Sequence, residues 1–296
     1  MNKTLLIMAA GSGSRYGSLK QFDELGPKKE YLLEFSIYDA IDSRFNQIVI
    51  ITKEEYVDEL KKYMKERLPN TIKINVIAQK ISNIPEGISV KVKRNKPWGT
   101  AHAVWVTKHL IHNSFVVINA DDFYGKKAFQ LASNFIEKHP EENVFGIVPY
   151  QLNKTLSDYG TVSRGICVFK EDKLYRVNEY KKLERKGSEV IDHETGDTFK
   201  GKEPISMNFW VCKPKIFDKI EKQFISNLKE GFGDKQEIYI PIVIQKLIEE
   251  EVLKVFATPT VSSWFGVTYA QDKSNAVKTL AELTVNNKYP TPLWKS

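Results

Sequence analysis

Cysteine is scarce in this 296-residue sequence, which contains only Cys167 and Cys212. Neither belongs to a CxxC or Cys/His spacing, so the sequence supports no zinc site and no disulfide framework, and a reducing cytoplasm fits best. Long apolar runs are also missing. No stretch approaches about 18 uninterrupted apolar residues, so we expect no membrane span. The short apolar run at residues 4–10 superficially resembles a signal peptide, but it leads straight into glycines, and we interpret it as a buried strand.

The charge has only a modest excess of one sign. Lys and Arg number 44 against 37 Asp and Glu, a net charge of +7 that favours anionic partners, either phosphorylated small molecules or nucleic acid. The most basic run, residues 91–96, alternates like a strand. We interpret it as a solvated edge or a phosphate-facing rim, and expect no nucleic-acid partner. With 42% apolar residues, the chain is predicted to be a soluble globular protein.

Apolar runs of strand length alternate with helical patterns along the chain. The runs lie at residues 5–9, 48–51, 72–77, 115–118 and 144–148. This alternation predicts a three-layer α/β fold with a mostly parallel, Rossmann-like sheet and helices on both faces. A small antiparallel region is expected over residues 156–208, with a mobile solvated loop at 181–202. Helices are expected at residues 54–68, 237–251 and 272–283.

The first predicted strand leads into a loop with glycines at Gly11, Gly13 and Gly17 and with two cations, Arg15 and Lys20. Glycines here let backbone N–H groups approach a phosphate closely. The Walker A spacing is absent, and GxGxxxG is one residue longer than the dinucleotide fingerprint. A tight turn is the alternative. The two cations favour a triphosphate under attack, because they can neutralise charge on the departing pyrophosphate.

The predicted strand at residues 115–118 ends in two carboxylates, Asp121 and Asp122. Ligands of open α/β sheets bind beyond the carboxyl ends of strands, and a carboxylate there suits Mg²⁺. Alternatively, one of the two caps the helix expected near Lys127.

A third feature, KPWGTAHAV at residues 96–104, places Gly99 and Thr100 at a helix start. Such a start offers free N–H donors and room for a flat ring against the backbone. His102 is more often structural or on the surface in such a position than catalytic.

Together and in this order, these features resemble the nucleotidyltransferase family, with its GT-A-like fold, which joins an NTP to a sugar 1-phosphate or related phosphate and releases pyrophosphate. Its opening AAGxGxRxG signature appears at residues 9–17, its GTAxA at 99–103 and its metal-binding aspartate as Asp121. The resemblance implies catalytic roles for Arg15, Lys20 and Asp121. It also implies an NTP-binding set consisting of Ala9, Ala10, Gly11, Gly13, Gly99, Thr100 and Ala101.

Later motifs carry the resemblance into the second half of the chain. DYGTV at 158–162 looks like the family's YGxV turn, RVNEYK at 176–181 echoes its Glu-Lys motif, and SMNFW at 206–210 looks like its Asn-containing strand. The acceptor-binding residues that this implies are Tyr159, Gly160, Glu179, Lys181 and Asn208. We expect one domain over residues 1–296, with an NTP half (about 1–125), an acceptor half (about 126–260) and a closing segment (about 261–296).

Two departures from the family pattern stand out. The base-reading glutamine would fall on Arg94, which is not an amide, and Asn95 is the available substitute. The WxDxGT-like stretch near the C-terminus reads WFGVT at 264–268 and lacks the second metal-binding aspartate. Asp272 can replace it as a Mg²⁺ ligand or can cap the last helix.

The resulting prediction is an Mg²⁺-dependent nucleotidyltransferase acting on an NTP and a phosphorylated small-molecule acceptor, with a homo-oligomer possible. Two rivals remain open: a GT-A-type glycosyltransferase that uses a nucleotide sugar, and a non-catalytic nucleotide-sugar sensor. The NTP base and the acceptor, which could be a non-sugar such as phosphocholine, are left open by the sequence.

Overall fold

The computed structural model describes residues 2–11, 22–89, 94–267 and 271–294. Four parallel strands form one half of its main sheet: β3 (Lys73–Ala78), β2 (Gln47–Thr52), β1 (Thr4–Met8) and β4 (Phe115–Asn119), in that spatial order. Each lies within one residue of a predicted apolar run. β1, β2 and β4 are buried along nearly their whole length, which explains why their sequences are continuously apolar.

The other half of the sheet is mixed. β13 (Trp210–Cys212) lies antiparallel between β4 and β6 (Val144–Ile147), and β14 (Lys254–Ala257) is parallel to β6. Four antiparallel strands follow: β9 (Lys173–Lys186), β8 (Val162–Lys170), β12 (Pro204–Ser206) and β7 (Tyr150–Gln151). A separate two-stranded sheet pairs β5 (Asp122–Phe123) with β15 (Phe265–Gly266). One sheet therefore runs through both halves of the chain.

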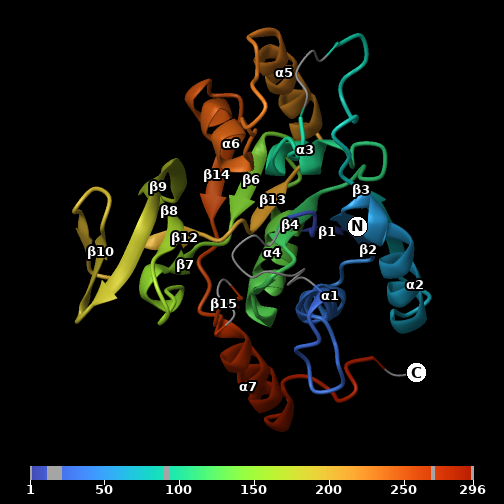
Figure 1. Ribbon diagram of the computed structural model, residues 1–296, viewed down its shortest axis with the longest axis vertical. Helices are drawn as coiled ribbons and strands as arrows, with labels where there is room; N and C mark the ends of the chain where they lie inside the picture. The colour runs from blue at the N-terminus through green and yellow to red at the C-terminus, as the bar shows by residue number, and fades with distance from the viewer. Residues whose placement is uncertain (1, 12–21, 90–93, 268–270, 295–296) are drawn as a thin grey trace.

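Helices cover both faces of this sheet, as predicted (Figure 1). One core contains α1 (Leu32–Asp42), α2 (Val57–Arg67) and α4 (Lys126–Lys138), and the other contains α3 (Thr100–Trp105), α5 (Ile216–Lys229) and α6 (Ile240–Glu249). Successive strand residues enter opposite cores, Leu5 and Ile7 on one side and Leu6 on the other. In a third core, α7 (Asp272–Val285) packs with α1 and β5.

Short 3-10 helices also occur: η2 (Glu54–Tyr56) lies before α2, and η3 (Leu152–Lys154) lies after β7. Among the described residues, no helix combines the length and apolar character needed to cross a membrane.

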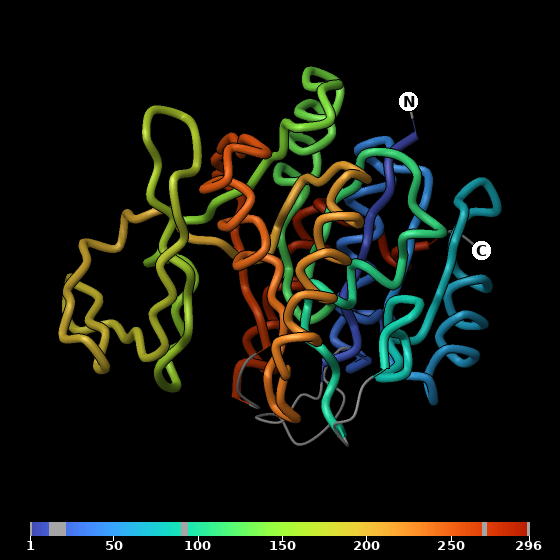
Figure 2. Tube along the Cα trace, turned by 90° about the horizontal axis from the view of Figure 1, so that it is seen from above, coloured from blue at the N-terminus to red at the C-terminus, as the bar shows by residue number. Residues whose placement is uncertain are grey.

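The predicted loop at residues 181–202 is wrong in large part, because most of it forms strands. β9 continues to Lys186 and pairs with β10 (Glu189–Asp192), which pairs in turn with β11 (Thr198–Phe199). This arm lies at the left of Figures 1 and 2. Val190 is buried, and the Asp192 carboxylate accepts hydrogen bonds from the backbone N–H groups of Lys182 and Thr195. The Asp192 carboxylate thus joins β9 to the turn that follows β10.

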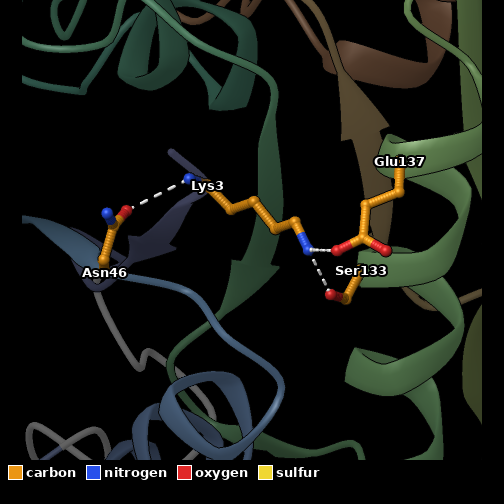
Figure 3. Close-up of polar contacts among 4 residues, drawn as sticks. All are labelled: Lys3, Asn46, Ser133 and Glu137. Carbon is orange, nitrogen blue, oxygen red and sulfur yellow. Dashed lines mark hydrogen bonds and ion pairs between the residues drawn. The ribbon is translucent and has the colours of Figure 1, made fainter. Parts of the chain in front are cut away.

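Lys3 ties the start of β1 to helix α4 (Figure 3). Its Nζ donates to Ser133 Oγ at 2.6 Å and to Glu137 Oε1 at 2.5 Å, and its backbone N–H donates to Asn46 Oδ1 at 3.1 Å. Lys3 is 1% exposed. At least one of the lysines therefore has a structural role, at the amino end of β1.

Candidate active site at the carboxyl edge of the sheet

The carboxyl ends of β1 and β4 bring two of the predicted site features together. Ala9, Ala10 and Gly11 directly follow β1, and Asp121 follows β4, its parallel neighbour. The Ala120 N–H donates to Met8 O at 3.1 Å, which holds the two chain segments side by side. Gly11 is exposed, and a Cβ added to it would meet no described atom within 4 Å.

Three residues of the predicted site, Gly13, Arg15 and Lys20, lie outside the described residues. Their roles stay predictions.

Asp121 and Asp122 differ in their surroundings. Asp122 is 7% exposed; its Oδ2 accepts the Asn119 Nδ2–H at 2.8 Å and lies 3.2 Å from the Tyr124 hydroxyl. Asp121 is half-buried, and its backbone oxygen accepts the Val267 N–H at 3.3 Å. Asp122 is therefore a structural carboxylate, whereas Asp121 is the one whose exposure suits ligand binding.

Neither aspartate caps the following helix. α4 begins at Lys126, its N-cap is Gly125 with φ of 73°, and no described side chain caps it. The capping alternative is therefore wrong for both Asp121 and Asp122. The backbone enters α4 at Gly125, and glycine adopts the positive φ needed there without strain.

Asn208, predicted on the acceptor side, lies beside the end of β4. Its Nδ2 is 3.4 Å from Asn119 Oδ1, although the two residues are 89 positions apart. The neighbouring carbonyl of Met207 accepts the Tyr124 hydroxyl at 2.8 Å. Asn208 has a left-handed φ of 58°, a conformation that asparagine tolerates better than most residues. A residue of the predicted acceptor half thus contacts β4, the strand of the NTP half that precedes Asp121.

Tyr159 and Gly160 lie in the loop that precedes β8. The Tyr159 ring is 44% exposed, and its hydroxyl is 3.5 Å from Asn275 Nδ2 on α7.

Glu179 and Lys181 lie close together on β9 but have different surroundings. Glu179 is opposite Gly165 on β8, where a Cβ would come within 2.8 Å of its Oε1. Desolvation raises the pKa of Glu179, and the positive charge of Arg164 opposes this rise. Lys181 Nζ is 3.8 Å from Glu194 Oε1 in the arm. The structure therefore directs Glu179 toward Arg164 and Lys181 toward the arm.

The GTA motif packs against a distant chain segment. Gly99 has φ of 100°, and a Cβ on it would lie 2.4 Å from Ile238 O. The same carbonyl accepts the Ala101 N–H at 3.0 Å, and the Thr100 hydroxyl accepts the Ile240 N–H at 3.1 Å. The prediction that this helix start offers free N–H donors is thus wrong for Ala101. The motif joins α3 to the start of α6.

A family comparison decides the class of the protein. The model of the family described as nucleotidyl transferase matches residues 4–270. The chain belongs to this family. Its members transfer nucleotidyl groups, so the chain is an enzyme of the nucleotidyltransferase class, in agreement with the resemblance found in the sequence. No curated protein sequence matches the chain.

Solved structures share the fold of this nucleotidyltransferase. An inositol-1-phosphate CTP transferase from T. maritima is similar with a TM-score of 0.65 and 14% identity, covering 96% of each chain. A protein named as a glucose-1-phosphate thymidylyltransferase from Bacillus anthracis, in complex with a sucrose, has a TM-score of 0.64 and 14% identity. It covers 94% of this chain and 95% of its own.

In this nucleotidyltransferase, Arg94 holds two segments of backbone together. Its guanidinium donates to four carbonyl oxygens, those of Lys96, Pro97, Gly233 and Gln236. It also lies 4.1 Å from the centre of the Trp98 ring, and the residue is 7% exposed. Its donors are engaged by backbone, so Arg94 does not replace a base-reading amide.

Asn95 borders a hollow of about 770 Å³ at the carboxyl edge of β2 and β3. Lys53 and Gln79, which directly follow these two strands, also line it. Asn95 is exposed, whereas Arg94 is not. Of the two, Asn95 is the residue whose side chain borders open space.

His102 has a structural role. It is fully buried, its Nε2 lies 2.7 Å from the Asn83 carbonyl, and its Nδ1 lies 3.0 Å from Gln79 Nε2. An Nε2–H donor and an Nδ1 acceptor satisfy both contacts in the neutral ring. Burial lowers the pKa of His102 to about 4, which agrees with the neutral form.

Arg164, on β8, is a residue that the motifs missed. Its Nε and Nη1 donate to the carbonyls of Thr155 and Ser163 at 3.0 and 2.8 Å, and its guanidinium lies 5.0 Å from the centre of the Trp264 ring. Burial lowers the pKa of Arg164 to about 10, and three carboxylates oppose this shift: Asp122, Asp272 and Glu179. These three carboxylates come from separate chain segments, so their shared electrostatic interaction with Arg164 becomes evident only in the folded structure.

The second predicted metal ligand, Asp272, comes from helix α7. Asp272 is the first residue of α7, whose N-cap is Gln271, so the N-cap prediction for Asp272 is wrong by one residue. Its Oδ1 accepts the Ser157 hydroxyl at 3.2 Å, and it lines a hollow of about 120 Å³ together with Gly266, the partner of Asp122. No three His, Cys, Asp or Glu side chains in the described ranges form a metal cluster. Mg²⁺ needs only one or two carboxylates when substrate phosphates and water complete its shell.

Proposed function

We propose that this enzyme transfers NMP from an NTP to a sugar 1-phosphate or a related phosphorylated small molecule and releases pyrophosphate. The observation that carries the proposal is the contact between the predicted acceptor half and the predicted NTP half. Asn208 Nδ2 lies 3.4 Å from Asn119 Oδ1, and Asn119 precedes Asp121 by two residues. The names of the two similar structures, with inositol 1-phosphate and glucose 1-phosphate as substrates, support this acceptor class.

In the proposed reaction, an oxygen of the acceptor phosphate forms a bond to the α-phosphorus of the NTP. The bond from that phosphorus to the bridging oxygen of the β-phosphate breaks, and pyrophosphate leaves with the electron pair. The acceptor phosphate is already an anion at neutral pH, so no side chain has to remove a proton. Catalysis then rests on positioning and electrostatics.

The chain's own residues divide this work. Backbone near Gly11 approaches the NTP phosphates, while Arg15 and Lys20 stabilise charge on the pyrophosphate side. Asn208 and Glu179 face the acceptor. Asp121 and Asp272 would hold Mg²⁺, which supplies positive charge to the reacting phosphates when bound. Because one sheet carries residues of both substrates, we further propose that residues 1–296 act as one functional domain.

A pyrophosphate-release screen tests the proposal. The common NTPs, including UTP and dTTP, are each combined with a panel of sugar 1-phosphates and phosphoalcohols in Mg²⁺ buffer. Pyrophosphate that requires both substrates supports the proposal. Release of a nucleoside diphosphate from a nucleotide sugar would instead identify a glycosyltransferase, and saturable binding without turnover would identify a sensor.

A further inference from the structure

Aromatic side chains line a hollow between α2 and the segment that precedes α1. The hollow measures about 290 Å³ and is lined by Phe22, Tyr31, Tyr56, Glu59, Leu60 and Tyr63. The last four recur at spacings of three, one and three residues, which places them on one face of η2 and α2. The other two rings come from the segment before α1. Two chain segments thus build one wall of aromatic rings.

The four rings form a continuous row. Tyr63 stacks on Tyr31 with centroids 4.4 Å apart and an interplanar angle of 16°. Phe22 then lies 5.8 Å from Tyr31 and 5.6 Å from Tyr56. All four rings are half-buried, so part of each remains accessible. The Tyr63 hydroxyl donates to the buried Glu34 carboxylate at 2.7 Å, which holds this end of the row in place.

Carboxylates outnumber cations among the charged groups that act on Tyr31. The exposed side chain of Glu59 lines the hollow. Burial raises the pKa of Tyr31, the negative charges of Glu59, Glu24 and Glu34 raise it further, and the positive charge of Arg67 acts in the opposite direction. In a chain of net charge +7, this local field disfavours a phosphate and favours a cation.

A cation already contacts the row from elsewhere. The Arg67 guanidinium lies 4.2 Å from the centre of the Tyr63 ring, and Arg67 does not line the hollow. The faces of aromatic rings attract cations because of their quadrupole. A bare metal ion would need more oxygen ligands than one carboxylate and the tyrosine hydroxyls supply here. A weakly hydrated organic cation fits the rings and the single carboxylate better.

From this geometry we propose that the hollow binds a small organic cation carrying a methylated ammonium group, with the rings around the methyl groups and Glu59 balancing the charge. Rings and a carboxylate are the chemistry that recognises quaternary ammonium groups. The lining of this hollow shares no residue with the proposed nucleotidyl-transfer site, and the proposal does not depend on that function.

Calorimetric titration of the full chain without nucleotide tests the site. The ligands are choline, tetramethylammonium, inorganic phosphate and 3,3-dimethyl-1-butanol, the neutral carbon analogue of choline. We expect both cations to bind saturably, the neutral analogue to bind at least about tenfold more weakly, and phosphate not to compete. Equal affinity for choline and its neutral analogue, competition by phosphate, or no saturable binding of either cation would overturn the proposal.

Two variants locate the binding. Tyr56→Leu and Glu59→Gln should each weaken choline binding several-fold, to about tenfold for the ring. Tyr175→Leu is the matched control, because Tyr175 is an exposed tyrosine on β9 that also contacts a cation, with Lys170 Nζ 3.5 Å from its ring centre. Unchanged binding in Glu59→Gln would contradict the assignment. Because Glu59 is exposed, this variant decides the matter even if Tyr56→Leu does not fold.

Discussion

Gly266 lies directly opposite Asp122 in the two-stranded sheet, and a Cβ on Gly266 would come within 2.6 Å of Asp122 Oδ1. The same Cβ would lie 2.8 Å from the Trp264 ring. Gly266 is the position at which the family's WxDxGT-like stretch carries its aspartate. Here the close approach of the strand to Asp122 leaves no room for a side chain unless Asp122 or Trp264 moves, so position 266 does not supply a carboxylate.

Replacing this glycine should disturb the site directly. Gly266→Ala should displace Asp122 or Trp264, lower the free energy of unfolding by about 1–3 kcal/mol, and reduce pyrophosphate release. Gly233→Ala is the control, since its Cβ would meet only the end of the Gln236 side chain at 3.3 Å. Urea unfolding and the activity assay check both variants. Wild-type stability in Gly266→Ala would show that this close contact is not rigid.

The two neighbouring aspartates should respond differently to the same substitution. Asp121→Asn should abolish Mg²⁺-dependent pyrophosphate release and leave the unfolding midpoint unchanged. Asp122→Asn places an amide donor beside the Asn119 amide, so it should lower the free energy of unfolding by about 1–3 kcal/mol. Full activity in a folded Asp121→Asn enzyme would contradict its role as a metal ligand.

Arg15 should contribute through electrostatics. Removing one preorganised cation that stabilises developing charge commonly costs on the order of 100-fold in rate. Arg15→Ala should therefore reduce kcat/KM by about this factor, with Lys61→Ala on the exposed side of α2 as the control. Steady-state pyrophosphate release measures both. An Arg15→Ala enzyme within a few-fold of the wild type would argue against the proposed grip on the triphosphate.

Asp39 on α1 should make the protein less stable as the pH rises from about 4 to about 7. Asp39 is fully buried, and burial raises its pKa to about 7, although the hydrogen bond from Tyr289 and the charge of Lys126 act in the opposite direction. Between the unfolded pKa near 3.8 and the folded value, the folded state binds more protons than the unfolded state. Stability is therefore lost as the pH rises across this window, by at most about 1.4 kcal/mol per pH unit.

Asp39→Asn removes this titration and should flatten the fall in stability between pH 4 and 7. Unfolding measured in urea at several pH values gives the slope, and Asp58→Asn, at an exposed position on α2, should keep the wild-type slope. The comparison between variants is needed because His102 affects the pH dependence of stability in the opposite direction. The pKa of His102 is lowered to about 4 in the folded state, so its protonation in the unfolded state reduces the stability of the protein as the pH falls below about 6.5. An unchanged slope in Asp39→Asn would contradict the shifted pKa.

Motif reasoning identified the edge of the sheet at which the site lies but did not assign each residue there. The order of apolar runs predicted β1 to β4 within one residue, and the carboxyl-edge rule then brought Gly11 and Asp121 together. The resemblance chose Asp121 as the metal-binding aspartate, but the residues themselves left either Asp121 or Asp122 as a possible helix cap, because adjacent residues share one sequence context. The structure separates the two, since Asn119 donates a hydrogen bond to Asp122, whose Oδ2 also lies 3.2 Å from the Tyr124 hydroxyl.

The sequence by itself determined the alternating α/β order, the glycine and aspartate motifs and the family, because these depend on local periodicity and on residue types at short spacings. Only the tertiary structure decided that Ala101 donates to Ile238, that Arg94 joins segments up to 142 residues apart, and that Arg164 faces three carboxylates. The charged segment from 181 to 202 shows the same division. Its composition predicted a loop, whereas it forms local hairpins, β9 with β10 and β10 with β11. Such hairpins are only marginally stable alone, and this one extends β9, which the main sheet holds through β8; that support depends on tertiary packing and cannot be read from the composition of the segment.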